Sequence, residues 1–249
     1  MTEFRAIKAL WYREVKAYSN DRPRIISSLV RSLLWLVIFG SGFSAARFSG
    51  LDMNYQEFLF PGIIGMSLLF TSMFAGISVI WDREFGFLKE IVVAPISRSS
   101  MLLGRVLGGA TIAMSEATLI LLLSFVIGVQ VNWINLPFIL ITMFLISSTL
   151  VSIGLTVASF IESFEGFNTI MSFVIMPMFF LSGAIFPFGN MPSWMKPLVY
   201  CNPLSYGVDA MRTLIIGVTY LNIYLDFAVL GACTLFTLSL GSRAFKARM

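Results

Sequence analysis

The sequence FLFPGIIGMSLLFTSMFAGISVIW, residues 58–81, is a run of 24 residues without a charged side chain. A bilayer core of ~30 Å needs about 20 helical residues, so this run is long enough for one transmembrane helix. The whole chain has the same character, because 57% of its 249 residues are hydrophobic, only 12% are charged, and the mean hydropathy is +0.87. These values exclude a soluble globular protein.

The same length criterion predicts five further spans, and with them an all-α membrane protein. The turn-forming segment 132–137 separates the third span from the fourth. An even number of spans places both chain ends on one side of the membrane. The predicted transmembrane helices are 25–46, 58–81, 106–130, 137–160, 166–187 and 225–242.

The distribution of basic residues predicts which side that is. With both ends in the cytoplasm, 14 of the 17 Lys and Arg residues lie on the cytoplasmic side, as the positive-inside rule requires. The basic excess of +4 is therefore assigned to membrane flanks and not to nucleic-acid binding.

The N-terminal segment 3–24 is predicted to be an amphipathic interfacial helix followed by a linker. Its apolar residues gather near one helical face and its basic residues largely on the other, which suits a cytoplasmic lipid surface. The apolar residues are Phe4, Ile7, Leu10, Trp11, Val15 and Tyr18.

Segment 82–105 is the longest predicted cytoplasmic connection after the N-terminal segment. It mixes charged residues with apolar ones such as Phe85 and Leu88. A loop that needs only solvation would omit the aromatic residues. We expect a short amphipathic helix that docks on a cytoplasmic protein; the alternative is plain packing beneath the helical bundle.

Segment 188–212 is rich in proline and still apolar. Prolines prevent one continuous helix, and the apolar side chains of residues 184–203 favour burial, so short helices that re-enter the outer half of the bilayer are predicted. Pro177 is expected to kink the preceding span. A lid lying flat at the outer interface is the alternative.

Glu116 is the only ionisable residue well inside a predicted span. It is interpreted either as a contact for a cation, proton or substrate in a central path, or as a protonated acid bonded to a hydroxyl on another helix, for example in 147–152. The nearby motif Gly104-x-x-x-Gly108 permits close helix approach, although such pairs are common by chance.

The absence of histidine and the presence of only two cysteines exclude the usual zinc, haem and Cys-His or Ser-His chemistries, so no catalytic, metal or cofactor residue is predicted. None of the five lysines follows a glycine, and a P-loop requires Gly-Lys before Ser or Thr. This sequence therefore supplies no ATP site of that kind.

Two local patterns resemble a known family, the permease subunits of ABC-2 exporters, including daunorubicin-resistance, nodulation-factor and polysaccharide-export permeases. The first is Arg83-Glu84-Phe85-Gly86 with Leu88, Glu90, Ala94-Pro95-Ile96-Ser97 and Gly104-Arg105; the second is Leu181-Ser182-Gly183, Phe186-Pro187, Pro192-x-Trp194, Asn202-Pro203-Leu204-x-Tyr206, Asp209 and Arg212.

The resemblance implies a homodimeric membrane core, or a heterodimer with a related permease, working with two copies of a separate ATPase that binds ATP and magnesium. It implies export of an amphipathic drug-like, lipid-linked or glycan substrate across the plasma membrane of a prokaryote. The implied ATPase-coupling residues are Arg83, Glu84, Phe85, Leu88, Lys89, Glu90 and Arg98. The implied residues of a re-entrant gate are Phe186, Pro187, Trp194, Asn202, Pro203 and Tyr206.

A six-helix ion-coupled secondary transporter is the main alternative. That class predicts several buried charges, whereas Glu116 alone qualifies in the sequence. A membrane-embedded enzyme would need a set of acid, nucleophile or metal residues at one depth, which the sequence does not offer.

Overall fold

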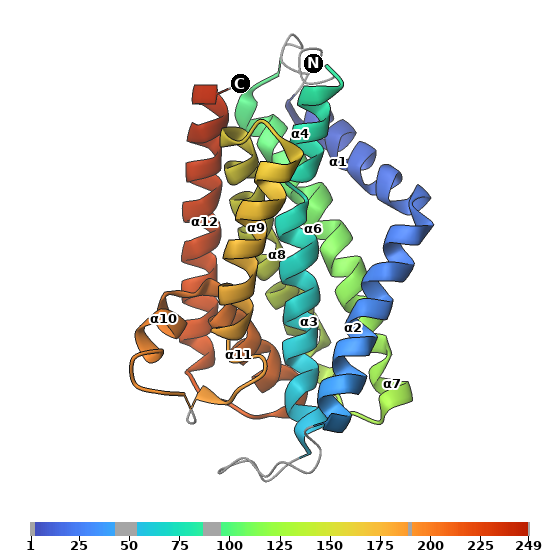
Figure 1. Cartoon of the computed structure of the whole chain (residues 1–249), viewed down its shortest axis with the longest axis vertical. Helices are drawn as coiled ribbons and strands as arrows, with labels where there is room; N and C mark the ends of the chain where they lie inside the picture. The colour runs from blue at the N-terminus through green and yellow to red at the C-terminus, as the bar shows by residue number, and fades with distance from the viewer. Residues whose placement is uncertain (1–2, 43–53, 87–95, 189–190, 249) are drawn as a thin grey trace.

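The computed structural model describes residues 3–42, 54–86, 96–188 and 191–248, and every regular element in those ranges is a helix (Figure 1). The elements are α1 (Glu3–Asn20), α2 (Arg22–Gly42), α3 (Tyr55–Phe74), α4 (Ile77–Glu84), α6 (Arg98–Leu122), α7 (Ser124–Ile127), η1 (Trp133–Asn135), α8 (Leu136–Phe160), α9 (Phe164–Phe180), α10 (Lys196–Cys201), α11 (Pro203–Ile216) and α12 (Ile223–Arg248). The N- and C-terminal ends lie at the same end of the bundle, as an even number of crossings predicts.

Five helical segments in the described ranges are long and apolar enough to cross a membrane. They are Arg22–Gly40, Tyr55–Glu84, Arg98–Ile127, Trp133–Phe160 and Ile223–Lys246. Helix α9, which occupies the predicted span 166–187, has 17 residues and is shorter than these five. At 1.5 Å per residue α9 is ~26 Å long.

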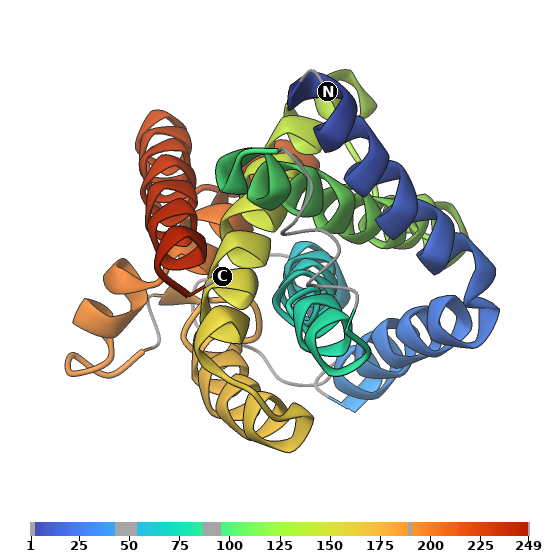
Figure 2. The ribbon, with the colours of Figure 1, turned by 90° about the horizontal axis from the view of Figure 1, so that it is seen from above.

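Helices α3 and α8 form the centre of the bundle. In the 18-residue apolar stretch of each of these two segments, 67% of the residues are buried. The corresponding share is 22% for the stretch in α2 and 17% for the stretch in α12. Figure 2 shows α2 and α12 on opposite sides of the bundle. A helix that is apolar all round belongs in a core, whereas apolar side chains left exposed on a peripheral helix suit a lipid environment.

The predicted span 58–81 is broken into α3 and α4. The break lies at Ala75 and Gly76, where the chain passes very close to α8. A Cβ added at Gly76 would lie 2.4 Å from the Gly154 carbonyl oxygen, and a Cβ added at Gly154 would lie 2.3 Å from the Met73 carbonyl oxygen. The two glycines therefore let α8 press against the backbone at the point where the helix bends.

The helix in the region of the third predicted span, 106–130, begins and ends at other residues than that span. Helix α6 begins at Arg98, eight residues before the predicted start at 106, so part of the predicted connection 82–105 belongs to a long helix. Its far end is Leu122, after which the short α7 and a left-handed Gly128 (φ +84°) turn the chain toward η1. Charge-free length did not indicate the helix ends, because Arg105, directly before the start of the charge-free run, is buried within α6.

Helices α10 and α11 lie at the end of the bundle opposite the termini (Figure 1). Almost every residue of α11 between Leu204 and Ile215 is buried, and the helix packs on α3, α8 and α12. The predicted segment 188–212 therefore extends four residues further, to Ile216.

Candidate functional site

Helix α1 packs along α6, and glycines on α6 make this close packing feasible. A Cβ added at Gly104 would lie 2.8 Å from the Cβ of Leu10, and one added at Gly108 would lie 2.7 Å from the Cβ of Glu14. The Gly104-x-x-x-Gly108 pair is thus the contact surface for the N-terminal helix. Beside it, Trp11 Nε1 donates a hydrogen bond to Thr111 Oγ1 at 3.0 Å.

A network of charges with Asp82 and Arg105 buried at its centre joins α1, α4 and α6. Asp82 accepts two hydrogen bonds from the guanidinium of Arg13 and one from Arg105 Nη2 at 2.5 Å. Arg105 Nη1 lies 3.7 Å from Glu14 Oε1 and donates to Ser78 Oγ at 3.2 Å. The buried pair Asp82 and Arg105 is thus flanked by one further cation and one further anion, so the four formal charges that join the three helices balance.

The environment of this network shifts the ionisation of its α1 members. Burial raises the pKa of Glu14, and the nearby Arg105 and Arg13 partly offset the increase. The hydrogen bond from Arg13 to Asp82 raises the pKa of Arg13, which keeps its guanidinium charged.

Glu116 lies next to this network on α6 and is almost fully buried, with 1% of its surface exposed. Both carboxylate oxygens accept hydrogen bonds, one from Tyr18 Oη at 2.5 Å and the other from Thr71 Oγ1 at 2.5 Å. The partner is a hydroxyl group on another helix, as one sequence interpretation expected. The expected location in 147–152 was wrong, because α1 and α3, not α8, face Glu116.

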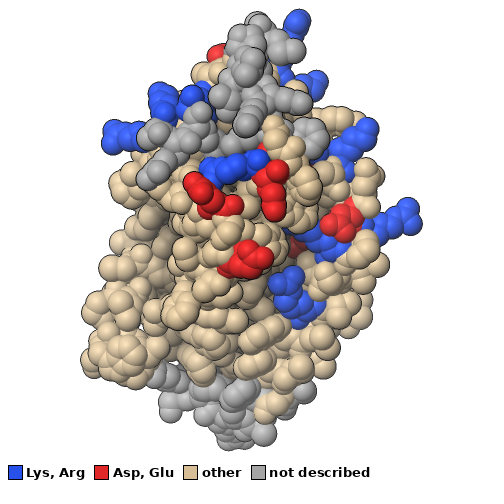
Figure 3. All heavy atoms as spheres, turned by 45° about the horizontal axis from the view of Figure 1, so that its top comes forward, with Lys and Arg blue, Asp and Glu red and all other residues tan. Residues whose placement is uncertain are grey.

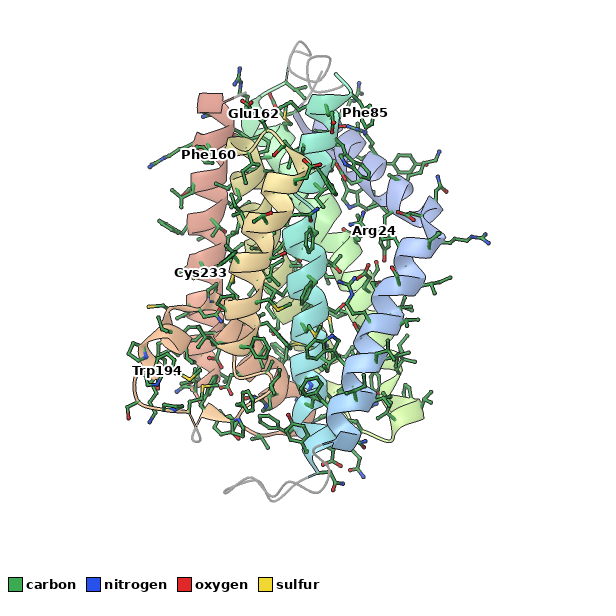
Figure 4. All side chains as sticks on the ribbon, in the orientation of Figure 1. Arg24, Phe85, Phe160, Glu162, Trp194 and Cys233 are labelled. Carbon is green, nitrogen blue, oxygen red and sulfur yellow. The ribbon has the colours of Figure 1, made fainter. Side chains whose placement is uncertain are left out.

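These side chains surround a cavity of about 490 Å³ between α1, α2, α3, α4 and α6. Arg24 lines it close to the corner between α1 and α2 (Figure 4). The other charged lining residues are Arg13, Glu14, Asp21, Arg31, Asp82, Arg105 and Glu116. Aromatic residues complete the walls: Tyr18, Phe70, Phe74, Trp81 and Phe164.

Two of the predicted ATPase-coupling residues bond the ends of other helices. Arg83 donates to the carbonyl oxygens of Ile161 at 3.0 Å and Ser159 at 3.4 Å, where α8 ends. Arg98 donates to the carbonyl oxygens of Phe245 at 3.2 Å and Lys246 at 3.4 Å near the end of α12. Cations at helix C-termini satisfy free carbonyl groups and favour the helix dipole.

The remaining predicted coupling residues divide into two groups. Glu84 and Phe85 are exposed at the end of the bundle that carries both termini, and Phe85 has 72% of its surface exposed (Figure 4). Leu88, Lys89 and Glu90 lie outside the described residues.

The predicted gate residues lie around α10 and α11. Asn202 caps α11 by accepting from Leu204 N, and its Nδ2 donates to the carbonyl oxygen of Met178 on α9 at 2.7 Å. Pro203 occupies the first turn of α11, where its missing N–H costs nothing. Tyr206 Oη donates to the carbonyl oxygen of Tyr200 at 2.8 Å, which ties α11 to α10.

The other gate residues do not share one environment. Pro187 is buried, Phe186 is 39% exposed and Trp194 is 69% exposed. Within this chain Met191 is 7% exposed, whereas Trp194 lies open, and the prediction that 184–203 is buried in the outer leaflet or against a dimer partner stays a prediction. Trp194 lies in the turn before α10, at the edge of the molecule, where none of the described helices covers it (Figure 4).

A second group of buried charges lies in α11 and α12. The sequence placed Asp209 and Arg212 in a family pattern without a predicted role in a site, and it did not single out Asp226. Arg212 is fully buried, donates from Nη2 to the Gly183 carbonyl oxygen at 2.8 Å, and stacks 4.1 Å from the centre of the Phe58 ring. Glu116 is thus not the only buried charged residue of the chain. The buried Asp, Glu and Arg residues among those described are Asp82, Arg105, Glu116, Asp209, Arg212 and Asp226.

The two aspartates of this second group differ in their partners. Asp209 accepts backbone hydrogen bonds from Leu221 N at 2.8 Å and Tyr220 N at 3.3 Å. Asp226 in the first turn of α12 is also fully buried, yet neither of its oxygens has a hydrogen-bond partner among the described residues. The sequence did contain a sign of this buried group. Asp209 and Arg212 are the two charged residues of α11, and their spacing of three residues places them on one face of that helix.

Known proteins are similar in sequence to this chain over most of its length. The profile of the ABC-2 type transporter family matches residues 5–216, from α1 to the end of α11. The ycf38 protein of Cyanophora paradoxa, named as a transport permease, is 30% identical over 194 residues, which cover 76% of this chain and 67% of that protein.

Two bacterial relatives match a larger share of this chain. The inner membrane transport permease YadH of Escherichia coli K12 is 24% identical over 230 residues, covering 90% of this chain and 88% of that protein. Nodulation protein J of Rhizobium leguminosarum bv. viciae is 25% identical over 225 residues, covering 89% and 86%. Together with the five long apolar helices, these matches make the chain a membrane protein of the permease type, and it belongs to the ABC-2 type transporter family.

Proposed function

We propose that this chain is the membrane-spanning permease subunit of an ATP-driven exporter. Two copies form the membrane core, and two copies of a separate ATPase subunit bind ATP and magnesium and drive it. The chain itself holds no cofactor. The substrate leaves the cytoplasm or the inner leaflet and belongs to the amphipathic drug-like, lipid-linked or glycan class.

The observation that best supports this proposal is the rigid connection between the exposed end of α4 and the spans. Glu84 and Phe85 form the exposed end of α4 and follow Asp82 by two and three residues. Asp82 in turn accepts hydrogen bonds from Arg13 of α1 and Arg105 of α6. A partner that pushes on this surface would move α1, α4 and α6 together, because the buried ion pairs resist separation. Such rigid-body motion is what an external ATPase needs in order to act on the membrane part.

The proposal includes six membrane crossings, with α9 as the fifth. Both termini lie in the cytoplasm, and α10 and α11 form a re-entrant element on the outer side of a prokaryotic plasma membrane. Support comes from the distribution of Lys and Arg and from the position of the two chain ends at one end of the bundle. Figure 3 shows charged side chains gathered toward that end, above a largely uncharged surface.

A secondary transporter driven by an ion gradient is the second candidate. The buried Asp209, Arg212 and Asp226 favour it, because buried charges within membrane helices often carry coupling ions. The two candidates differ in their energy source, so one preparation can distinguish them.

The test is purification of a tagged chain from membranes of its native host in a mild detergent. We expect a polypeptide with a Gly-Lys-Ser or Gly-Lys-Thr P-loop to copurify, and the eluate to hydrolyse ATP. A chain that purifies alone, and transports in proteoliposomes with an ion gradient and no ATP, would contradict the proposal and support the secondary transporter.

A further inference from the structure

The first span presents two chemically different faces along its cytoplasmic half. Ile26, Val30 and Leu34 repeat every four residues and are exposed, with 46% to 60% of their surface accessible. On the other face, Arg24, Ser28 and Arg31 line the cavity between α2 and the bundle. Residues four and seven apart share a helix face, so both arginines point to the same space.

Neither of these two arginines has an ion-pair partner within the described residues. The guanidinium of Arg24 lies 5.7 Å from the centre of the Tyr18 ring, and that of Arg31 lies 5.4 Å from the centre of the Phe70 ring. Every salt bridge among the described residues uses Arg13 or Arg105 instead. The aromatic rings thus position two guanidinium groups without neutralising them.

The carboxylates that line the cavity are already engaged. Asp82 and Glu14 face Arg13 and Arg105 in the buried network. Both oxygens of Glu116 accept hydrogen bonds from hydroxyl groups.

Asp21 is the one lining carboxylate left. Its Oδ1 accepts from the backbone N of Arg24 at 3.2 Å and so caps the start of α2. Four arginines and four carboxylates line the cavity, so its formal charges balance. Arg24 and Arg31 are nevertheless the two lining cations that form no ion pair among the described residues, and their guanidinium donors are available to an anionic group.

The position of Arg31 makes a guanidinium group without an ion-pair partner costly. It lies seven residues after Arg24, about 10 Å further along the helix, inside the segment Arg22–Gly40 that is apolar enough to span a membrane. A charged side chain at that depth needs an anionic partner or a path to the membrane surface. A phosphate diester suits a guanidinium group, because it accepts two parallel hydrogen bonds.

We propose that this cavity binds the headgroup of an anionic phospholipid from the cytoplasmic leaflet, with its phosphate held by Arg24 and Arg31. Its volume of about 490 Å³ is in the range of pockets that hold small molecules. The aromatic walls at Phe70, Phe74 and Trp81 offer apolar surface to the glycerol and the first part of an acyl chain. This binding needs neither the ATPase partner nor transport, so it can be tested independently of the proposed function.

The test is native mass spectrometry of the full chain released from detergent micelles that contain equal amounts of phosphatidylglycerol and phosphatidylcholine. We expect the wild-type chain to retain phosphatidylglycerol preferentially. In the Arg24→Gln, Arg31→Gln double variant we expect retention to fall at least about tenfold, since the loss of even one charge-assisted hydrogen bond costs about that factor. Equal retention of the two lipids by the wild-type chain would overturn the proposal without any variant.

A matched control separates this site from general attraction to anionic lipid. Lys16 and Arg22 are exposed on the same two helices but do not line the cavity, so the Lys16→Gln, Arg22→Gln variant removes the same charge. Its phosphatidylglycerol retention should stay within about twofold of the wild type. An equal loss in both variants would mean unspecific surface attraction and would contradict the proposal.

Two further measurements test the role of the guanidinium group and distinguish a bound lipid from a free anion. Arg31→Lys keeps the charge but loses the planar pair of donors, so retention should lie between those of the wild type and the double variant. Inorganic phosphate at millimolar concentration should not displace the lipid, because the apolar part of the lipid also contributes. Complete displacement by phosphate would identify a free-anion site and overturn the assignment to a lipid.

Discussion

Buried charges in this chain fall into two groups with different degrees of compensation. Around Asp82 each charge meets an opposite charge or a hydroxyl group, and the members come from three helices. Around Asp226 compensation is incomplete, because its carboxylate has no hydrogen-bond partner among the described residues. The first group is expected to stabilise the arrangement of helices, and the second to cost stability.

The first prediction concerns Asp82. Substitution Asp82→Asn keeps the size of the side chain but leaves Arg105 buried with only the more distant Glu14 as an anion. Breaking a buried ion pair from one side costs about 3 to 5 kcal/mol, so thermal unfolding in detergent should occur at a clearly lower temperature. Glu84→Gln, two residues further along and exposed, is the control and should unfold like the wild type. Equal unfolding temperatures for the two variants would show that the network contributes nothing to stability.

The second prediction compares Asp226 with Asp209. Asp226→Asn removes a buried charge that has no partner, and should raise the free energy of unfolding by about 1 to 3 kcal/mol. Asp209→Asn exchanges one of two acceptor oxygens for a donor facing a backbone N–H, and should lower it. Chemical denaturation of both variants in the same detergent measures the difference. A loss of stability in Asp226→Asn would mean that the carboxylate has a partner in the assembled membrane protein.

The sequence indicated some of these residues and not others, for a physical reason. Glu116 stood out because it interrupts a long apolar run, whereas Asp82 and Arg105 border such runs and resemble ordinary membrane flanks. Their pairing depends on the packing of α1 over α4 and α6, which is a tertiary property. A charge at the edge of a hydrophobic segment can be buried or solvated, and only packing decides between them.

At the scale of elements, hydrophobic length predicted which segments are helices better than where they end. Span 137–160 was predicted within one residue of α8, which begins with Leu136 and Pro137 at its first turn. The predicted span 166–187 ends at Phe180 instead, because Pro177 removes a hydrogen bond near the end and Gly183 turns the chain with a φ of +74°. Apolar residues continue past the end of the helix, so composition alone does not mark it.

The element-scale prediction concerns the glycines under α1. In Gly108→Leu the new side chain would meet the Cβ of Glu14 in α1, so α1 must shift and the ion pairs with α4 and α6 must weaken. We expect faster proteolysis within residues 3–20 of the purified chain. The matched control is Gly231→Leu, because a Cβ at Gly231 in α12 meets no atom within 4 Å. Equal cleavage rates in the two variants would mean that α1 tolerates displacement from α6.

At the scale of the whole molecule, the described helices connect two separate polar regions through an apolar centre. The ion-pair network and the cavity lie toward the end with the termini, and the buried charges of α11 and α12 lie toward the opposite end, where α11 packs against α3, α8 and α12. Helices α3 and α8 run between these regions and are mostly buried. Helix α3 reaches both regions, because it precedes α4 in the chain and Gly65 in α3 lets Val208 of α11 approach closely.

The final prediction tests whether the exposed end of α4 receives a partner. Phe85 has 72% of its surface exposed beside Glu84, and an exposed aromatic side chain at the predicted cytoplasmic face suits an apolar contact with an ATPase. Loss of one such buried contact costs about 2 kcal/mol or more, so Phe85→Asp should reduce the amount of copurifying ATPase and the ATP hydrolysis in the eluate at least about tenfold.

The control places the same substitution at the other end of the bundle. Ile134→Asp replaces a side chain that is 88% exposed in η1, so it should leave copurification unchanged. Both variants should reach the membrane in wild-type amounts, because neither side chain is packed in the core. Normal ATPase recovery with Phe85→Asp would show that the partner binds elsewhere, on the terminal segments or on residues 87–95. Selective loss at Phe85 would place the input of the energy at α4, directly next to the ion pairs that hold α1 and α6.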